Sequence, residues 1–161
     1  MEWPGNTQKK TDRNTQTLFD AGVLYLSSGA FVSAYACFER IADKSFSLLF
    51  NKALCCFGVS WYEECYRLLC DAERLLPTGM DPHPTGLPEI FLRWECENAQ
   101  PLSPILPDIP ASILITPFLR LKAETAFKLH LYEEVKKISA RLGGKYKPIG
   151  EPIKPVNDDN E

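Results

Sequence analysis

Apolar residues recur three and four positions apart over three stretches of this chain. The stretches run from about residue 15 to 42, from 46 to 76 and from 116 to 142. This spacing places the apolar side chains on one face of a helix. Each stretch is broken near its middle, which predicts two amphipathic helices joined by a tight turn. The pattern therefore predicts an all-α protein made of three helical hairpins.

Prolines separate the second hairpin from the third. Proline lacks an N–H donor and clashes with the preceding helical turn, so we expect no long helix in the insertion, residues 78–115. The pair Thr116-Pro117 is typical of a cap followed by a first-turn proline, which predicts that the last hairpin begins there. We expect a flexible N-terminus over 1–13, a helical domain over 14–148 and a flexible acidic tail over 149–161.

The three hairpins can be aligned with one another. Gly22, Ala53 and Ala123 fall in register, where small residues let two helices approach closely. The strings WYEEC at 61–65 and LYEEV at 131–135 then begin the second helix of their hairpins.

This arrangement resembles the tetratricopeptide repeat (TPR), a helix-turn-helix unit of about 34 residues. The resemblance implies a short superhelix with repeats at about 15–45, 46–77 and 116–148. It also implies a protein-binding scaffold or adaptor and not an enzyme.

In a superhelix of this kind the first helix of each repeat lines a concave groove. The residues expected there are Phe19, Asp20, Val23, Leu26, Ser27, Phe50, Asn51, Leu54, Phe57, Arg120, Leu121, Glu124, Phe127 and Lys128. We expect Phe19, Phe50 and Phe127 to share one hollow. Burying one large apolar side chain is worth roughly 1.5–3 kcal/mol, so a groove this apolar needs a cover.

Two covers fit the composition of the groove. One is an apolar peptide or amphipathic helix of a partner protein. The other is the insertion itself, through Ile90–Trp94 or Ile105–Ile115.

Two narrower resemblances bear on the possible partner. Some TPR proteins clamp the C-terminal carboxylate of chaperones with basic and asparagine side chains, but only Asn51 stands at a matching position here, and Phe19, Val23, Pro117 and Leu121 replace the rest. The first two repeats are also similar to the opening of the large cytosolic activator subunit of phagocyte NADPH oxidase, through Gly22-Val23 and Phe50-Asn51. That similarity implies a regulator that binds a small GTPase, but it assigns no binding residue because the insertion does not align.

Composition narrows the choice of partner. A net charge of −3 and an isoelectric point near 5.5 argue against a nucleic-acid-binding surface. No apolar run is long enough for a membrane span. The six cysteines form no CxxC pair and the chain has two histidines, so we expect no metal, no cofactor and no catalytic residue. We expect reduced thiols and a cytoplasmic location.

Three hypotheses remain open, the third of which is the small-GTPase-binding regulator of an oxidase-like complex that the narrower similarity implies. The first is an interaction module that binds a protein partner in the concave groove. The second is a structural subunit, a homo-oligomer that associates through the uncapped third repeat, since no further capping helix is expected after Leu142.

Overall fold

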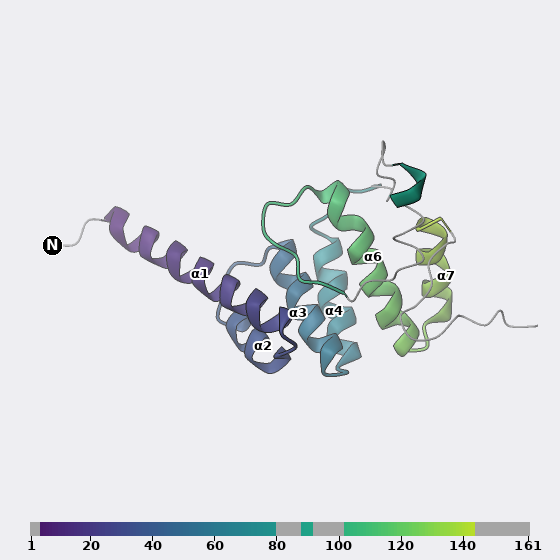
Figure 1. Ribbon diagram of the computed structural model, residues 1–161, viewed down its shortest axis with the longest axis horizontal. Coiled ribbons are helices and arrows are strands. Elements are labelled where there is room, and N and C mark those ends of the chain that lie inside the picture. The colour runs from purple at the N-terminus through teal and green to yellow at the C-terminus, as the bar shows by residue number, and fades with distance from the viewer. Residues whose placement is uncertain (1–3, 80–87, 92–101, 144–161) are drawn as a thin grey trace, which may run out of the picture.

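The computed structural model describes residues 4–79, 88–91 and 102–143, with side chains from residue 12 onward (Figure 1). Helices joined by turns and loops make up these residues, and no strand occurs among them. The helices are α1 (Pro4–Ser27), α2 (Phe31–Glu39), α3 (Phe46–Gly58), α4 (Tyr62–Glu73), α6 (Ala111–Lys128) and α7 (Tyr132–Arg141). A further short helical segment covers 89–91. The expected all-α class is confirmed for this part of the chain.

The helices form three hairpins whose turns share one geometry. The residue two positions before each second helix has a positive φ, which is 78° at Gly29, 63° at Ser60 and 61° at His130. The next amide donates to the carbonyl five residues earlier, with N···O distances of 2.8, 2.8 and 2.9 Å in the three turns. This bond satisfies a carbonyl that the end of the first helix leaves free. The breaks expected from the sequence are therefore real turns.

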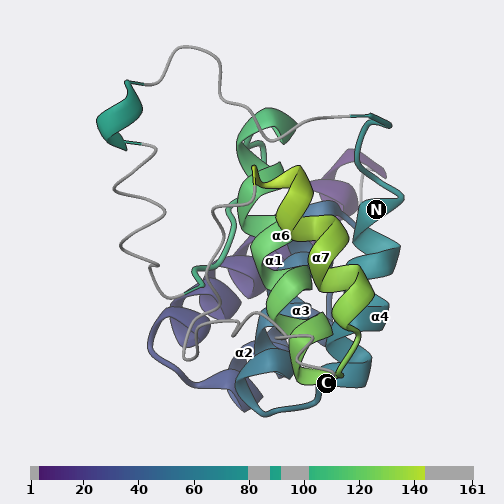
Figure 2. The same ribbon diagram turned by 90° about the vertical axis from the view of Figure 1, so that its right-hand side faces the viewer.

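The hairpins lie side by side in chain order (Figures 1 and 2). Each helix packs against the next, so that α2 contacts α3, and α4 contacts α6. The first helices also form a row of their own, in which α3 contacts both α1 and α6. Helix α3 therefore lies at the centre of the molecule.

Local sequence explains how α3 and the first hairpin form. Ser45 caps α3, because its Oγ accepts a hydrogen bond from the Leu48 amide at 3.2 Å. In the first hairpin the Phe38 ring lies so close to Gly22 that an added Cβ would come within 2.5 Å of it. A glycine is needed there because any side chain would overlap the ring.

Two expected helix boundaries are wrong. Helix α1 begins at Pro4, ahead of residue 14, where the helical domain was expected to begin. Helix α6 begins at Ala111 and contains Pro117, which was expected in its first turn. A proline inside a helix costs about 3 kcal/mol. The extra turn buries Leu114 and Ile115, each worth roughly 1.5–3 kcal/mol, and this burial offsets the cost.

Some expectations lie outside the described residues. These are the acidic tail over 149–161 and the part of the Ile90–Trp94 segment beyond residue 91. Within that segment Ile90 and Phe91 are 68% and 61% exposed. They do not cover the groove.

Candidate functional site

The candidate site is the face formed by α1, α3 and α6, across which residues 102–106 run. We call these residues the strap. Figure 1 shows the strap returning across α3 before the chain turns into α6. Ile105 is its buried residue, whereas Ser103 and Leu106 are exposed. The insertion therefore covers part of this face through Ile105, which belongs to the segment 105–115, one of the two covers expected from the sequence.

The Asn51 side chain holds the strap through hydrogen bonds to the strap's backbone. Its Nδ2 donates to the Ile105 carbonyl at 2.8 Å, and the Ile105 amide donates to its Oδ1 at 2.8 Å. Asn51 is fully buried on α3, where an unpaired amide would be costly. Both of its polar atoms are satisfied by a single strap residue.

The strap leaves a pocket of about 820 Å³ open beside it, which we call the groove pocket. Its apolar walls come from α1, α3, the first turn and the strap, and Glu124 and Lys128 of α6 add opposite charges. The apolar lining residues are Val23, Leu26, Phe31, Leu54, Phe57, Leu102, Pro104 and Leu106. A concave apolar site with a few polar groups at its border is typical of a binding pocket.

A smaller pocket of about 380 Å³ lies on the other side of the strap. Phe50 and Arg120 line it, together with the first turns of α6. Ile113, which also lines it, is 62% exposed. The strap thus has open space on both sides.

The structure brings together most of the residues that the sequence placed in the groove. Those that line the groove pocket are Val23, Leu26, Ser27, Leu54, Phe57, Glu124 and Lys128. Asn51 lies under the strap, and Phe50 and Arg120 lie on its far side. Leu26, Phe50 and Leu54 are buried, so they form the floor of the site and not a surface that a partner contacts freely.

The remaining predicted residues lie elsewhere. Phe19 packs edge-on against Phe38 at 5.7 Å between α1 and α2, and Phe127 packs against Tyr132 at 6.0 Å near the last turn. The expectation that these two rings share one hollow with Phe50 is wrong, because each ring packs against an aromatic ring of its own hairpin, the first for Phe19 and the third for Phe127. Leu121 is fully buried, and the exposed Asp20 accepts a hydrogen bond from Gln16.

Sequence reasoning did not assign several residues of the site. Phe31 and Tyr62 begin the second helices of their hairpins, yet both line the groove pocket. Residues 102–104 of the strap were expected only as part of the insertion, whereas Ile105 and Leu106 belong to the segment 105–115 that was expected as a possible cover. Helical periodicity carries no signal for the strap, because the strap is not helical. Its contact with Asn51 spans 54 positions.

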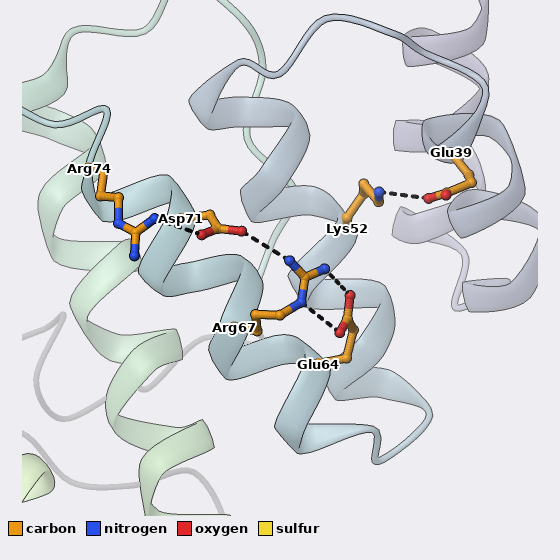
Figure 3. Close-up of polar contacts among 6 residues, drawn as sticks. All are labelled: Glu39, Lys52, Glu64, Arg67, Asp71 and Arg74. Atoms are coloured by element: carbon orange, nitrogen blue, oxygen red, sulfur yellow. Dashed lines mark hydrogen bonds and ion pairs between the residues drawn. The ribbon is translucent and has the colours of Figure 1, made fainter.

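Charged residues along α4 are paired among themselves. Arg67 of α4 donates from Nε to Glu64 at 2.9 Å and from Nη1 to Asp71 at 3.1 Å, and Arg74 also reaches Asp71 (Figure 3). The pairing with Arg67 lowers the pKa of Glu64. These contacts form an exposed ladder along one helix, and they leave no one-sided charged patch there.

A second ionic cluster joins three helices. Lys122 of α6 donates from Nζ to Glu73 of α4 at 2.6 Å and lies 3.5 Å from Glu134 of α7. Burial lowers the pKa of Lys122, but the hydrogen bond and charge of Glu73 outweigh it, so that the pKa is raised. The ammonium group is therefore charged and holds the third hairpin against the second.

The buried thiols of Cys55, Cys56 and Cys65 have low reactivity. Burial raises the pKa of Cys55 and of Cys65 to about 12 and that of Cys56 to about 11. The Cys65 thiol also lies 3.3 Å from Thr125 Oγ1, across the contact between α4 and α6. Thiols that stay protonated are poor nucleophiles and poor metal ligands. These three cysteines behave as core residues.

Neither a metal cluster nor a membrane span is found in the part of the chain that the structure describes. No group of three or more His, Cys, Asp or Glu side chains there is placed to hold an ion. No helix in the same residues is both long and apolar enough to cross a bilayer.

Comparisons with protein families, with curated proteins and with solved structures found no match.

Proposed function

We propose that this chain is a non-enzymatic protein-interaction module of TPR-like architecture, which binds an apolar segment of a partner protein in its groove. The observation that carries the proposal is the groove pocket, a cavity of about 820 Å³ with apolar walls beside a strap held by Asn51. An open apolar pocket in a small helical protein is a site where a partner gains free energy by burial.

The TPR-like assignment has its own support. The three turns share the same positive φ and the same hydrogen bond, and equivalent ring pairs, Phe57–Tyr62 and Phe127–Tyr132, follow in the second and third hairpins. The helices contact one another in chain order, as stacked repeats do. This packing supports the proposal of a concave face lined by the first helices.

Self-association through the third hairpin has less support. The exposed side of α7 carries Glu133, Lys136, Lys137 and Arg141. A surface of this composition does not favour the apolar contact of an obligate dimer.

The experiment compares two matched double variants. Val23→Glu with Ser27→Arg places charge on α1 inside the groove pocket, whereas Val32→Glu with Ser33→Arg makes the same changes on exposed positions of α2. Each protein is used to capture partners from a native extract, and captured proteins are purified and titrated. We expect the groove variant to lose at least about tenfold in affinity, a change of 1.4 kcal/mol. Equal binding by all three proteins would refute the proposal.

A further inference from the structure

We propose that the groove recognises an extended apolar segment by its backbone, and that the strap occupies the place of such a segment from a partner. The inference rests on the proposed function and names its binding mode. The partner segment is extended, with a branched aliphatic residue where Ile105 lies and further apolar residues that reach the groove pocket. The strap is then an internal competitor for the site.

Asn51 sets the requirement for an extended backbone. Its amide has a donor and an acceptor, and both pair at 2.8 Å with the C=O and N–H of one residue, Ile105. This is the pairing that a neighbouring β-strand would offer, and it reads the backbone irrespective of the side chain. Because Asn51 is fully buried, any occupant of the site has to present both groups at this point.

The strap uses only part of the available surface. Ile105 is buried, but Leu102 and Pro104 are half-buried and Leu106 is 53% exposed. The open pockets on its two sides measure about 820 and 380 Å³. A partner segment that pairs with Asn51 and also fills the larger pocket makes contacts that the strap does not make. Such a segment can replace the strap, although the strap is held at a high local concentration by its connection to the chain.

The test uses a fluorescent peptide with the sequence of residues 102–109, LSPILPDI, and the full chain. Ile105→Asp removes the strap from the site, because burying a carboxylate in the apolar surroundings of residue 105 is unfavourable. We expect the peptide to bind this variant at least about tenfold more tightly than the wild type. Ile90→Asp makes the same change in the insertion at a position that is 68% exposed and lines neither pocket, so it is the matched control and is expected to leave the affinity unchanged.

Two further changes test the role of the backbone. A peptide N-methylated at the isoleucine that corresponds to Ile105 keeps its side chain but cannot donate to Asn51 Oδ1. We expect it to bind at least about tenfold more weakly. Adding Asn51→Leu to Ile105→Asp should abolish the gain in peptide affinity.

Hydrogen exchange on the wild type provides a readout that does not depend on the folding of a variant. Saturating peptide should accelerate exchange at the Ile105 amide and leave the α3 amides protected. Equal peptide affinity for wild type, Ile105→Asp and Ile90→Asp, or no effect of N-methylation, would overturn the inference. A wild-type dimer with exchanged straps would also overturn it, because a second copy would then be the occupant. If the Val23 and Ser27 variant loses a partner while the peptide fails every test, the proposed function stands and only this binding mode falls.

Discussion

Single residues in the three turns bear a conformational cost that differs from turn to turn. A left-handed φ costs a glycine little, but it costs other residues roughly 1–2 kcal/mol. Gly29 therefore fits its turn without strain, whereas Ser60 and His130 do not. Side chains offset part of this cost, since Tyr62 donates to Ser60 Oγ at 3.3 Å and His130 Nδ1 lies 2.8 Å from the Tyr132 hydroxyl.

Ser60→Gly should stabilise the protein. The substitution relieves the left-handed strain and gives up only a long, exposed hydrogen bond. We expect a gain of about 0.5–1 kcal/mol in the free energy of unfolding, measured by urea denaturation. Gly29→Ala at the equivalent position should lower it by about 1 kcal/mol. A destabilised Ser60→Gly protein would contradict this account of the turns.

The buried thiols should make the fold sensitive to alkali. In the unfolded chain a thiol ionises near pH 9, but burial raises the pKa of Cys55 and Cys65 to about 12 in the folded protein. Above pH 9 the folded state therefore binds more protons than the unfolded state, and stability falls as the pH rises.

We expect each of these thiols to cost roughly 1 kcal/mol of stability by pH 10, relative to pH 8. Urea denaturation at the two pH values measures the loss. In Cys65→Ala the loss on going to pH 10 should be smaller by about the contribution of one thiol. An identical loss in wild type and variant would show that Cys65 ionises as easily in the folded protein as in the unfolded chain.

At the scale of the element, helix α6 of the third hairpin provides the contacts that attach this hairpin to the second. Its N-terminal turns border the strap, and its centre carries Lys122 to the carboxylates of α4 and α7. The Lys122 side chain is 8% exposed, whereas Arg67 in the α4 ladder is 59% exposed. The two cations should therefore differ in their effect on stability.

Lys122→Ala should cost about 1.5–3 kcal/mol, because it removes a charge-assisted hydrogen bond to Glu73 and leaves the part-exposed Glu73 and Glu134 without their shared cation. Arg67→Ala should cost about 1 kcal/mol or less, since an exposed pair is screened by water. Thermal and urea unfolding of both variants tests the contrast. Equal effects would mean that the link between α4, α6 and α7 is not held by this charge.

At the scale of the whole molecule, the third hairpin is attached through a limited set of contacts. Phe118 of α6 is fully buried, and its ring lies 5.6 Å from that of Phe46 in α3. Cys65 and Thr125 join α4 to α6 nearby. Stacked hairpins gain their stability from such neighbouring interfaces, and a weak interface can open by itself.

Phe118→Ala should destabilise the third hairpin selectively. A buried phenylalanine replaced by alanine typically costs about 3–5 kcal/mol. We expect hydrogen exchange to accelerate over α6 and α7 and to remain slow over α1 and α2. Uniform acceleration over all helices would show that the protein unfolds as a single cooperative unit.

Local sequence was enough to predict much of the architecture. Apolar spacing and small residues located three hairpins and their turns, because helix formation depends on contacts three and four positions apart. The paired glutamates at 63–64 and 133–134 were expected in first turns, and they lie there. The groove residues, Val23, Phe57 and Lys128 among them, were expected from the resemblance to the tetratricopeptide repeat, which assigns the first helix of each hairpin to the groove.

Only the tertiary structure decided how the groove is covered and which residues remain accessible. The Asn51–Ile105 pairing, the Lys122 cluster and the capture of Phe19 by Phe38 join residues from different elements. The start of α6 ahead of Pro117 depends on the burial of Leu114 and Ile115. Local spacing cannot predict these outcomes, because each is set by the free energy of burying a side chain against a surface that exists only after the hairpins have packed.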